Sequence, residues 1–225
     1  MAYFTATPEE LLGSLNAVER RNSPKLLWYQ GHREFLRERR VSVVGTRKAS
    51  EAGLRRAARL ATELARADVV VVSGLALGVD AAAHRAAIQA GGRTIAVLGN
   101  GIDLCSPKAN QELQELIARD HLVLSQFEPG TLPIDRNFPQ RNRTMALVSE
   151  ATVIIEAQER SGTVTQGWEG IRLGRPVFVL RSLLESGLAW PKLMVDYGAE
   201  VLDGTYTVLD ALPPVGRFDA VAMGF

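Results

Sequence analysis

The sequence predicts an α/β fold of the Rossmann-like, doubly wound class, with a mostly parallel sheet and helices on both of its faces. Three observations support this prediction. Short apolar runs rich in β-branched residues recur along the chain, segments of helical periodicity stand between them, and glycine-containing turns follow the runs. Strands buried on both faces read as continuous apolar runs, and alternation of strand and helix favours right-handed crossovers in a parallel sheet.

The predicted elements follow one another in a regular order. The predicted strands cover residues 41–45, 68–74, 94–101, 121–125, 152–157 and 176–180. The first helix between them, over residues 50–66, has its apolar face at Leu54, Ala57, Ala58, Ala61, Leu64 and Ala65. The second, over residues 79–92, ends in a glycine pair suited to a C-cap. Nearer the start, Thr7 followed by Pro8 and two glutamates predicts a capped helix.

This pattern divides the chain into three parts. Residues 1–40 are expected to form an N-terminal helical or extended appendage, and residues 41–205 the Rossmann-like domain. Residues 206–225 are expected to be a C-terminal tail, because prolines and glycines punctuate them.

Composition excludes several classes of protein. The chain has 225 residues, 26 basic and 25 acidic, so any attraction for a polyanion must come from local charge. The single cysteine, Cys105, excludes an intramolecular disulfide framework and any CxxC motif. No apolar run approaches the roughly 20 residues that cross a bilayer, so we expect a cytoplasmic protein without membrane attachment.

A ligand site is predicted at the carboxyl ends of the strands, where open parallel sheets bind their ligands. The loops there contain Gly45, Thr46, Arg47, Lys48, Ser73, Gly74, Gly78, Gly99, Ser161, Gly162 and Thr163. Glycine lets backbone amides approach a ligand, and each following helix directs its positive end to the same edge. An anionic ligand is therefore expected. For any single loop, a glycine needed only to start the helix is an equally good interpretation.

Basic side chains strengthen the prediction of an anion site. Those near the expected rim are Arg47, Lys48, Lys108, Arg141 and Arg143. Guanidinium forks and ammonium groups both suit phosphates. An isolated basic residue is more often a solvated surface charge, and for Arg143 a salt bridge that fixes its loop is the alternative.

Catalytic and metal sites have little support. Asp80 and His84 are four residues apart on one predicted helix, but no third ligand with suitable spacing is visible, so a capping or surface role is favoured over a metal or acid–base couple. Ser73 does not lie in a GxSxG motif, and neither GxxxxGK[ST] nor GxGxxG is complete. We therefore predict no catalytic residue, no metal and no cofactor. Trp168 is expected in the core or an interface, with base stacking as the alternative.

Residues 26–202 resemble the DprA/Smf DNA-processing family. The segments that carry the resemblance are VSVVGTRKAS, VVSGLALGVDAAAHRAAIQAGGRTIAVLGNGIDLCSPKAN, LSQFEPG and FPQRNRTMALVSEATVIIEAQERSGT. The resemblance implies non-catalytic binding of single-stranded DNA in a basic pocket, a homodimer, and loading of the RecA recombinase in natural transformation or recombination. It also implies DNA contacts by Arg47 and by the SPKAN segment, which contains Lys108 and Asn110, and it assigns Arg141, Asn142 and Arg143 to the FPxRNR signature.

Residues 136–144, RNFPQRNRT, contain this signature, and we expect them to form a proline-braced loop. Arg141 and Arg143 would line the pocket, and Asn142 would tie neighbouring loop backbones together. Phosphates would also meet the loop amides of Gly74 and Gly162. The apolar segment 183–195 is a candidate dimer surface, although a buried helix explains it equally well.

The chain also departs from the family pattern. Ser106 stands where a tyrosine precedes the proline, and Arg181 and Ser182 replace a Pro-Gly pair. The residues after Leu202 are too few for the winged helix of many members, so a minimal or divergent member is expected.

The runner-up interpretation is an enzyme of the related phosphoribohydrolases, which share this sheet and carry a PGGxGTxxE loop. Gln166 stands where that loop has its acid, and an amide cannot act as a general base. Glu156 and Glu169 are nearby carboxylates that leave nucleoside-monophosphate hydrolysis open. A nucleotide-sensing module is the third interpretation.

Overall fold

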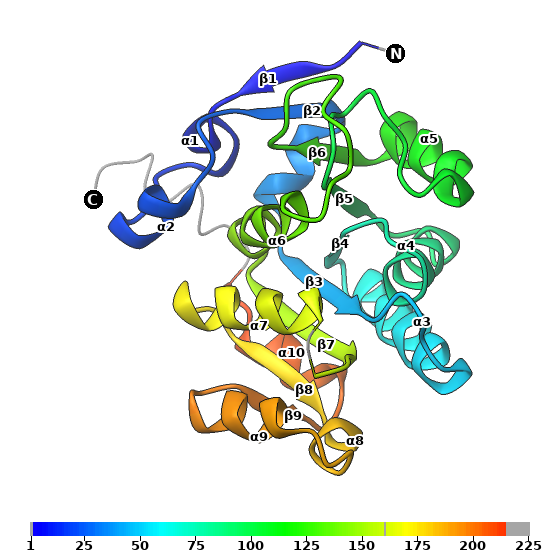
Figure 1. The fold of residues 1–225 in the computed structure, drawn as a ribbon, viewed down its shortest axis with the longest axis vertical. Coiled ribbons are helices and arrows are strands. Elements are labelled where there is room, and N and C mark those ends of the chain that lie inside the picture. The colour runs from blue at the N-terminus through cyan, green and yellow to red at the C-terminus, as the bar shows by residue number, and fades with distance from the viewer. Residues whose placement is uncertain (1, 160, 215–225) are drawn as a thin grey trace.

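The sheet at the centre of the protein is mostly parallel, as predicted (Figure 1). The computed structural model describes residues 2–159 and 161–214. Within them the strands form one nine-stranded sheet in the order β1-β2-β6-β5-β4-β3-β7-β8-β9. The strands from β3 to β9 pair in parallel, whereas β1 and β2 are antiparallel to their neighbours. The prediction of a doubly wound α/β fold is confirmed.

All six predicted strands are present. The strands are β1 (Phe4–Ala6), β2 (Leu27–Gly31), β3 (Arg40–Gly45), β4 (Val70–Ser73), β5 (Thr94–Leu98), β6 (Leu122–Ser125), β7 (Ala151–Glu156), β8 (Val177–Leu180) and β9 (Glu200–Leu202). Sequence reasoning missed β1, β2 and β9. These strands lie toward the two sides of the sheet and are partly exposed, so they lack the continuous apolar run of a strand buried on both faces.

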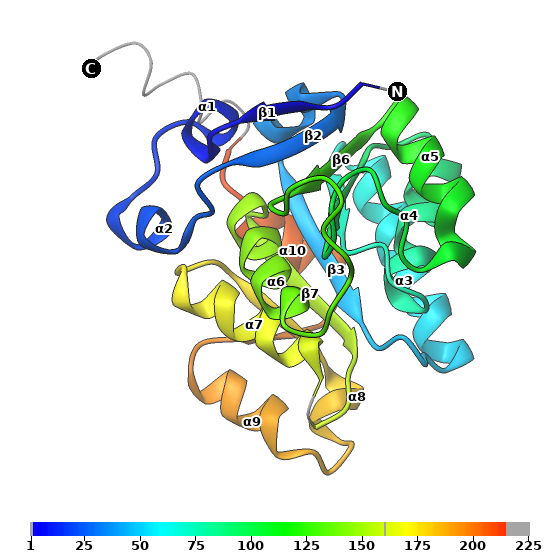
Figure 2. The same cartoon turned by 45° about the horizontal axis from the view of Figure 1, so that its top comes forward.

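Helices cover both faces of the sheet (Figures 1 and 2). Their bounds are α1 (Pro8–Leu12), α2 (Ala17–Asn22), η1 (Arg33–Arg37), α3 (Glu51–Arg66), α4 (Val79–Gln89), η2 (Lys108–Asn110), α5 (Gln111–Asp120), α6 (Asn137–Val148), α7 (Gly162–Arg172), α8 (Arg181–Leu184), α9 (Ala189–Asp196) and α10 (Thr205–Ala211). One face carries α1, α6, α7 and α9, and the other carries α3, α4, α5 and α10. No helix within the described ranges has the length and apolarity needed to cross a membrane.

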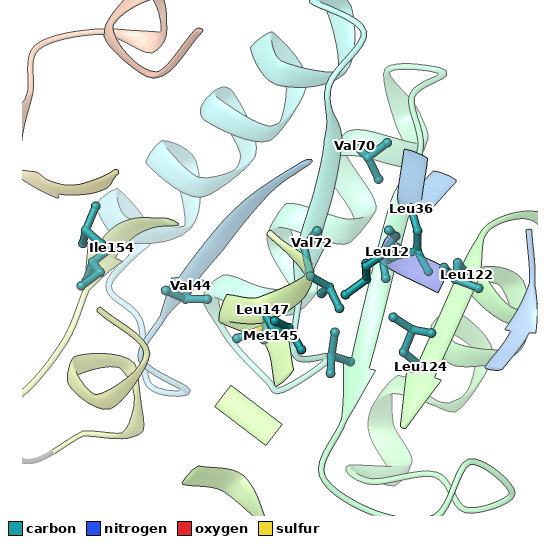
Figure 3. Close-up of a cluster of buried hydrophobic side chains, with 14 of the residues drawn as sticks. Leu12, Leu36, Val44, Val70, Val72, Leu122, Leu124, Met145, Leu147 and Ile154 are labelled. Carbon is teal, nitrogen blue, oxygen red and sulfur yellow. The ribbon is translucent and has the colours of Figure 1, made fainter. Parts of the chain in front are cut away.

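Alternate residues of each central strand feed different cores. In β4, Val70 and Val72 pack with the α6 and α7 side, and Val71 packs with the α3 and α4 side. Figure 3 shows the first of these cores, where Val70 and Val72 lie among Leu122, Leu124 and residues of α6. This two-sided burial is what makes the strand sequences apolar throughout.

The first 40 residues contribute to the same sheet. The predicted helix start is confirmed, because Thr7 forms a capping box with Glu10 at the beginning of α1. Further along, β2 pairs with β6 in the register Tyr29 to Leu124 and connects β1 to the sheet. The division at residues 40 and 205 remains a prediction. In the predicted tail, α10 buries Val208, and residues 215–225 lie outside the described residues.

The strand order reverses direction between β3 and β7. Strands β4, β5 and β6 follow on one side of β3, whereas β7, β8 and β9 follow on the other. The β3 chain continues into α3 on one face, and the β7 chain continues into α7 on the opposite face. The loops after β3 and β7 therefore diverge at the topological position where such folds bind ligands, and we call this position the crevice.

The buried side chain of Arg40 joins residues 33–39, which we call the connector, to the C-terminal end of α6. Arg40 is 2% exposed, and its Nε donates to the Val148 carbonyl at 2.7 Å. Its Nη1 donates to the carbonyls of Leu36 and Glu38, and Glu150 supplies a counter-charge at 3.7 Å. Burial lowers the pKa of Arg40 to about 10, so the guanidinium remains charged near neutral pH.

We predict that Arg40→Met destabilises the protein by about 3 kcal/mol, because buried carbonyls would lose their donor and Glu150 its partner. Urea denaturation measures the free energy of unfolding. The matched control is Arg37→Met, which changes an exposed arginine on the same connector and should be nearly neutral. Equal losses in the two variants would contradict the assigned role of Arg40.

Candidate functional site

The stretch RNFPQRNRT begins helix α6 and is not the loop predicted from its proline. Pro139 is the third residue of α6 (Asn137–Val148). Amides of the first helical turn have no partner within the helix, so a proline there removes no hydrogen bond. The expectation of a proline-braced loop over residues 136–144 was wrong for this reason. The helical geometry instead sends successive side chains of the motif in different directions.

Arg141 points into the protein and not toward a ligand. It is 6% exposed, and its Nη1 donates to the carbonyl oxygens of Gly74 at 2.6 Å and Val97 at 3.1 Å. These bonds fasten α6 to the chain at the carboxyl ends of β4 and β5. Burial lowers the pKa of Arg141, and the negative charge of Asp80 acts in the opposite direction.

The peptide groups around Gly74 are held from two sides. Asp80, buried at the start of α4, accepts a hydrogen bond from Gly74 N at 3.1 Å, while Arg141 binds the Gly74 carbonyl. A Cβ atom at Gly74 would lie 1.5 Å from Arg141 Nη1, so the close approach requires glycine. The Gly74 amide expected to meet a phosphate is therefore already engaged within the protein. Burial raises the pKa of Asp80, and the Arg141 charge opposes this shift.

Two other predicted site residues are buried and use their polar groups on backbone. The Ser73 hydroxyl donates to the Val43 carbonyl at 2.7 Å. Asn110 Nδ2 donates to the Leu75 carbonyl at 2.9 Å. These residues shape the loop that follows β4 and have no side-chain donor directed at the crevice.

Asn142 links α6 to the start of α7. Its Nδ2 donates to the Gly162 carbonyl at 2.7 Å, which bears out the expectation that it ties neighbouring backbones together. Gly162 itself is exposed and begins α7, and Thr163 beside it is buried. The Ser161 hydroxyl, which precedes them, has no hydrogen-bond partner among the described residues. The start of α7 therefore lies open on the β7 side of the crevice.

Arg47 lies on the opposite side of the crevice and contacts α6. Its side chain is exposed, and its Cζ is 4.8 Å from the centroid of the Phe138 ring. Phe138 also packs against Gly99, where a Cβ would be 2.8 Å from the ring. Sequence reasoning did not assign Phe138 to the site, although its place beside Pro139 in the FPxRNR motif was a usable signal. A cation stacked on an aromatic ring is thus exposed at the rim.

Glycine positions bring the Arg47 loop close to α4. Gly78 has φ +78°, and a Cβ there would lie 2.4 Å from the Thr46 carbonyl oxygen. Gly45 is similarly close to Val79. Lys48 is exposed, and its backbone amide donates to Thr46 Oγ1 at 3.3 Å. The loop therefore presents Arg47 and Lys48 to solvent from a backbone that packs closely on α4.

The carboxylates considered for catalysis are occupied. Glu156 accepts hydrogen bonds from the Ser50 amide at 3.2 Å and from its hydroxyl at 2.8 Å. Ser50 in turn caps α3 through Gly53 N, so Glu156 supports a helix start. Glu169 is paired with Arg143 and Arg172. Gln166, in the position of the enzyme family's acid, is fully buried.

Lys108 is separate from the Arg47 group. It is exposed and lines a hollow of about 640 Å³, whose wall includes Tyr3, Gln30, Cys105 and Leu132. No contact between described residues joins Lys108 to Arg47. The structure therefore brings Arg47 and Lys48 together with Phe138 and leaves Lys108 at the part of the edge next to the N-terminal strands.

Asp80 and His84 share a helix, but Asp80 accepts from the Gly74 amide whereas His84 bonds to the Thr94 hydroxyl. The Thr94 hydroxyl donates to the Val71 carbonyl at 2.7 Å, so it accepts from His84 Nδ1 at 2.6 Å. His84 is fully buried, and this burial lowers its pKa to about 3. The two side chains therefore form no acid–base couple. No cluster of three or more potential metal ligands occurs among residues 2–159 and 161–214.

Comparison with known proteins identifies the family. The sequence pattern of the family described as DNA recombination-mediator protein A matches residues 8–213. The chain belongs to this family. The DNA processing protein DprA of Streptococcus pneumoniae is 42% identical over 168 residues, which are 75% of this chain and 59% of the relative. The chain thus spans about three fifths of the length of that relative.

Two solved structures of DNA processing protein A have the same fold. The Streptococcus pneumoniae protein aligns with a TM-score of 0.82 at 34% identity, over 94% of this chain and 75% of the other. The Helicobacter pylori protein, whose structure describes a single-stranded DNA binding mode, aligns with a TM-score of 0.80 at 26% identity, over 94% and 97%. The DNA recombination-mediator family therefore shares both the sheet and its helices with this chain.

We predict that His84 makes the stability of this family member depend on pH. Because its pKa falls from the ordinary 6.5 to about 3 on folding, the unfolded chain binds more protons between these values. The full contribution of neutral His84 to the free energy of unfolding is present above pH 6.5. This contribution is lost as the pH falls toward 3, at up to about 1.4 kcal/mol per pH unit. Urea denaturation between about pH 4.5 and about pH 8 measures it.

The test compares wild type with His84→Asn, which retains a donor to Thr94 but does not titrate. The difference in free energy of unfolding between the two proteins should shrink as the pH falls, because only wild type loses the contribution of His84. Asp80 and the other titrating groups are present in both proteins, so their effects cancel in the difference. Gln89→Asn, an exposed change on the same helix that involves no titrating group, is the control and should differ from wild type by a constant amount at every pH. A His84→Asn difference that stays constant with pH would refute the prediction.

Proposed function

We propose that this chain binds single-stranded DNA without catalysing a reaction on it, and acts as a recombination mediator in DNA processing. The observation that carries the proposal is the exposed Arg47, which follows β3 and is stacked on Phe138 at the carboxyl ends of the strands. Support comes from membership of the DNA recombination-mediator family and from the Helicobacter pylori relative, described as binding single-stranded DNA.

The crevice offers the two kinds of contact that a single strand needs. Arg47 and Lys48 supply positive charge for phosphates on the β3 side, and the exposed start of α7 at Gly162 supplies amides and the positive end of a helix on the β7 side. The half-buried Phe138 ring, stacked with Arg47, adds aromatic surface to the rim for contact with a base. Contacts to phosphate and to the flat face of a base do not depend on sequence, so sequence preference should be weak.

The same site gives no support to the hydrolase alternative. Glu156 is bound to Ser50, and both oxygens of Glu169 are bound to arginines. The Ser73 hydroxyl is buried and donates to a backbone carbonyl. A general base needs a free acceptor within reach of the substrate proton, and these candidates are engaged elsewhere.

RecA and a second copy of the chain are the partners we include in the proposal, together with a cytoplasmic location and a role in natural transformation. In the candidate dimer segment 183–195, Trp190 and Met194 are buried, whereas Leu193 is 49% exposed. Tyr197, just beyond it, is exposed and meets Trp168 edge-on at 5.5 Å between ring centroids. The buried part serves the core, and the exposed part of α9 remains the candidate surface for a second copy.

We predict that Arg47→Glu weakens binding of labelled oligo-dT by at least about tenfold. The slope of log affinity against log salt concentration should become shallower by about 0.7 for each phosphate that the variant no longer neutralises. Fluorescence anisotropy at several salt concentrations measures both, with a matched duplex as competitor. Wild type should prefer the single strand. Lys108→Glu should also weaken binding, because Lys108 belongs to the predicted contact set.

The matched control is Arg85→Glu, which reverses an exposed charge on α4, on the sheet face opposite α6. It should leave oligo-dT binding nearly unchanged. Equal affinity of wild type for single strand and duplex would contradict the proposed function. Unchanged binding by Arg47→Glu would remove the crevice as its site.

A further inference from the structure

We propose that the outer face of α6 and α7 is a second phosphate-binding surface, formed by Arg143 and Arg172 and held in place by the buried carboxylate of Glu169. This inference rests on the proposed function, because the surface would hold the part of a single strand that extends beyond the crevice. Glu169 and Arg172 were not among the site residues predicted from sequence. Figures 1 and 2 show α6 and α7 side by side on the same face of the sheet.

The two arginines share one carboxylate. Arg143 Nε donates to Glu169 Oε1 at 3.0 Å, and Arg172 Nε donates to Glu169 Oε2 at 2.8 Å. Arg172 Nη2 also contacts Oε2. The Glu169 side chain is 10% exposed, whereas those of Arg143 and Arg172 are 54% and 37% exposed. The carboxylate is therefore enclosed, and the cluster keeps one net positive charge that faces solvent.

The geometry leaves donors available on the outer side. Arg143 uses only Nε on Glu169, and neither of its Nη atoms has a hydrogen-bond partner within the described part of the chain. The planar guanidinium offers paired donors whose spacing matches two oxygens of a phosphate. A carboxylate that holds such a group in one orientation lowers the entropy cost of binding a phosphate there.

Buried polar contacts hold together the two helices beneath this surface. Asn142 Nδ2 bonds the Gly162 carbonyl at 2.7 Å at one end of α7, and the fully buried Gln166 packs between the helices. Arg141 anchors α6 to the sheet. The Arg143–Glu169–Arg172 cluster therefore has a fixed position relative to the crevice.

The surface lies on the solvent side of α6, away from the contact between Phe138 and Arg47. Phe138 and Arg143 are five residues apart on one helix, which is about 7.5 Å along its axis and roughly 140° around it. Arg136 and Gln140, about two turns and one turn before Arg143 on its face, are also exposed. A strand that crosses the beginning of α6 meets these exposed polar and basic side chains before it reaches the cluster. This extended row of positive charge favours a nucleic-acid strand, with its repeated phosphates, as the occupant over a small anionic partner.

The experiment measures how oligo-dT affinity grows with length, from about 4 to about 20 nucleotides, by fluorescence anisotropy. We expect Arg172→Ala to bind the shortest oligonucleotides like wild type. Longer ones should bind Arg172→Ala roughly threefold to tenfold more weakly, with a salt slope shallower by about 0.7. The control is Arg85→Ala, on the opposite face of the sheet, which should match wild type at every length.

A second variant tests the positioning role of Glu169. Glu169→Gln removes a negative charge, so a purely electrostatic surface would bind long oligonucleotides more tightly. If the carboxylate positions the two arginines, Glu169→Gln should instead lose part of the increase in affinity that wild type shows for longer oligonucleotides. Tighter or unchanged binding would overturn the role of Glu169, provided that urea denaturation shows an intact fold.

The outcomes separate the two proposals. If wild type binds no oligonucleotide of any length, the proposed function fails. If wild type binds and Arg172→Ala has the same affinity at every length, only the second surface is overturned. An equal loss at all lengths would also overturn it, because the residue would then act on the crevice itself or on the fold.

Discussion

The arrangement of the site depends on one buried guanidinium, that of Arg141. It connects α6 to the carboxyl ends of β4 and β5 through the carbonyls of Gly74 and Val97. Removing an arginine from water costs several kcal/mol, and here two hydrogen bonds and the charge of Asp80 offset that cost. Because α6 is anchored in this way, the other side chains of its first turns have defined positions.

The FPxRNR motif therefore combines support and exposure within one helix. Arg141 points inward, Asn142 reaches the start of α7, and Arg143 faces solvent beside Glu169. Consecutive residues of a helix are turned by about 100°, which is why three neighbouring polar side chains serve three different surroundings. Phe138 adds an aromatic ring at the rim, in contact with Arg47 from the β3 loop. The motif thus joins both sides of the crevice.

Glycine has an equally specific structural role around this helix. Gly74 has no space for a side chain because Arg141 fills it, and Gly99 has none because Phe138 lies against it. Gly78 lets the Arg47 loop approach α4. These glycines were expected to bring amides to a ligand. The structure shows that they bring side chains and loops of the protein itself close together, and the exposed Gly162 is the one that retains the expected setting.

The sequence by itself determined the fold class and the six central strands, and it placed the candidate site at the carboxyl ends of those strands. Strands such as β4, buried on both faces, are almost entirely apolar, so they are visible in the sequence without knowledge of their neighbours. The order of motifs around Arg47 and Arg141 indicated the family, since these motifs stand at fixed places between the strands of the sheet. The short strands β1, β2 and β9 have no such pattern.

Only the tertiary structure decided which basic residues are available to a ligand. Arg141 and Arg143 are two residues apart in the same motif, yet one is 6% exposed and the other carries a side chain that is 54% exposed. Lys108 follows β5 as Arg47 follows β3, yet it lines a hollow shared with Tyr3 and Gln30 from the N-terminal strands' region. Burial and pairing depend on residues distant in sequence, such as Gly74 and Glu169, and the packing that brings them together is a property of the folded chain as a whole.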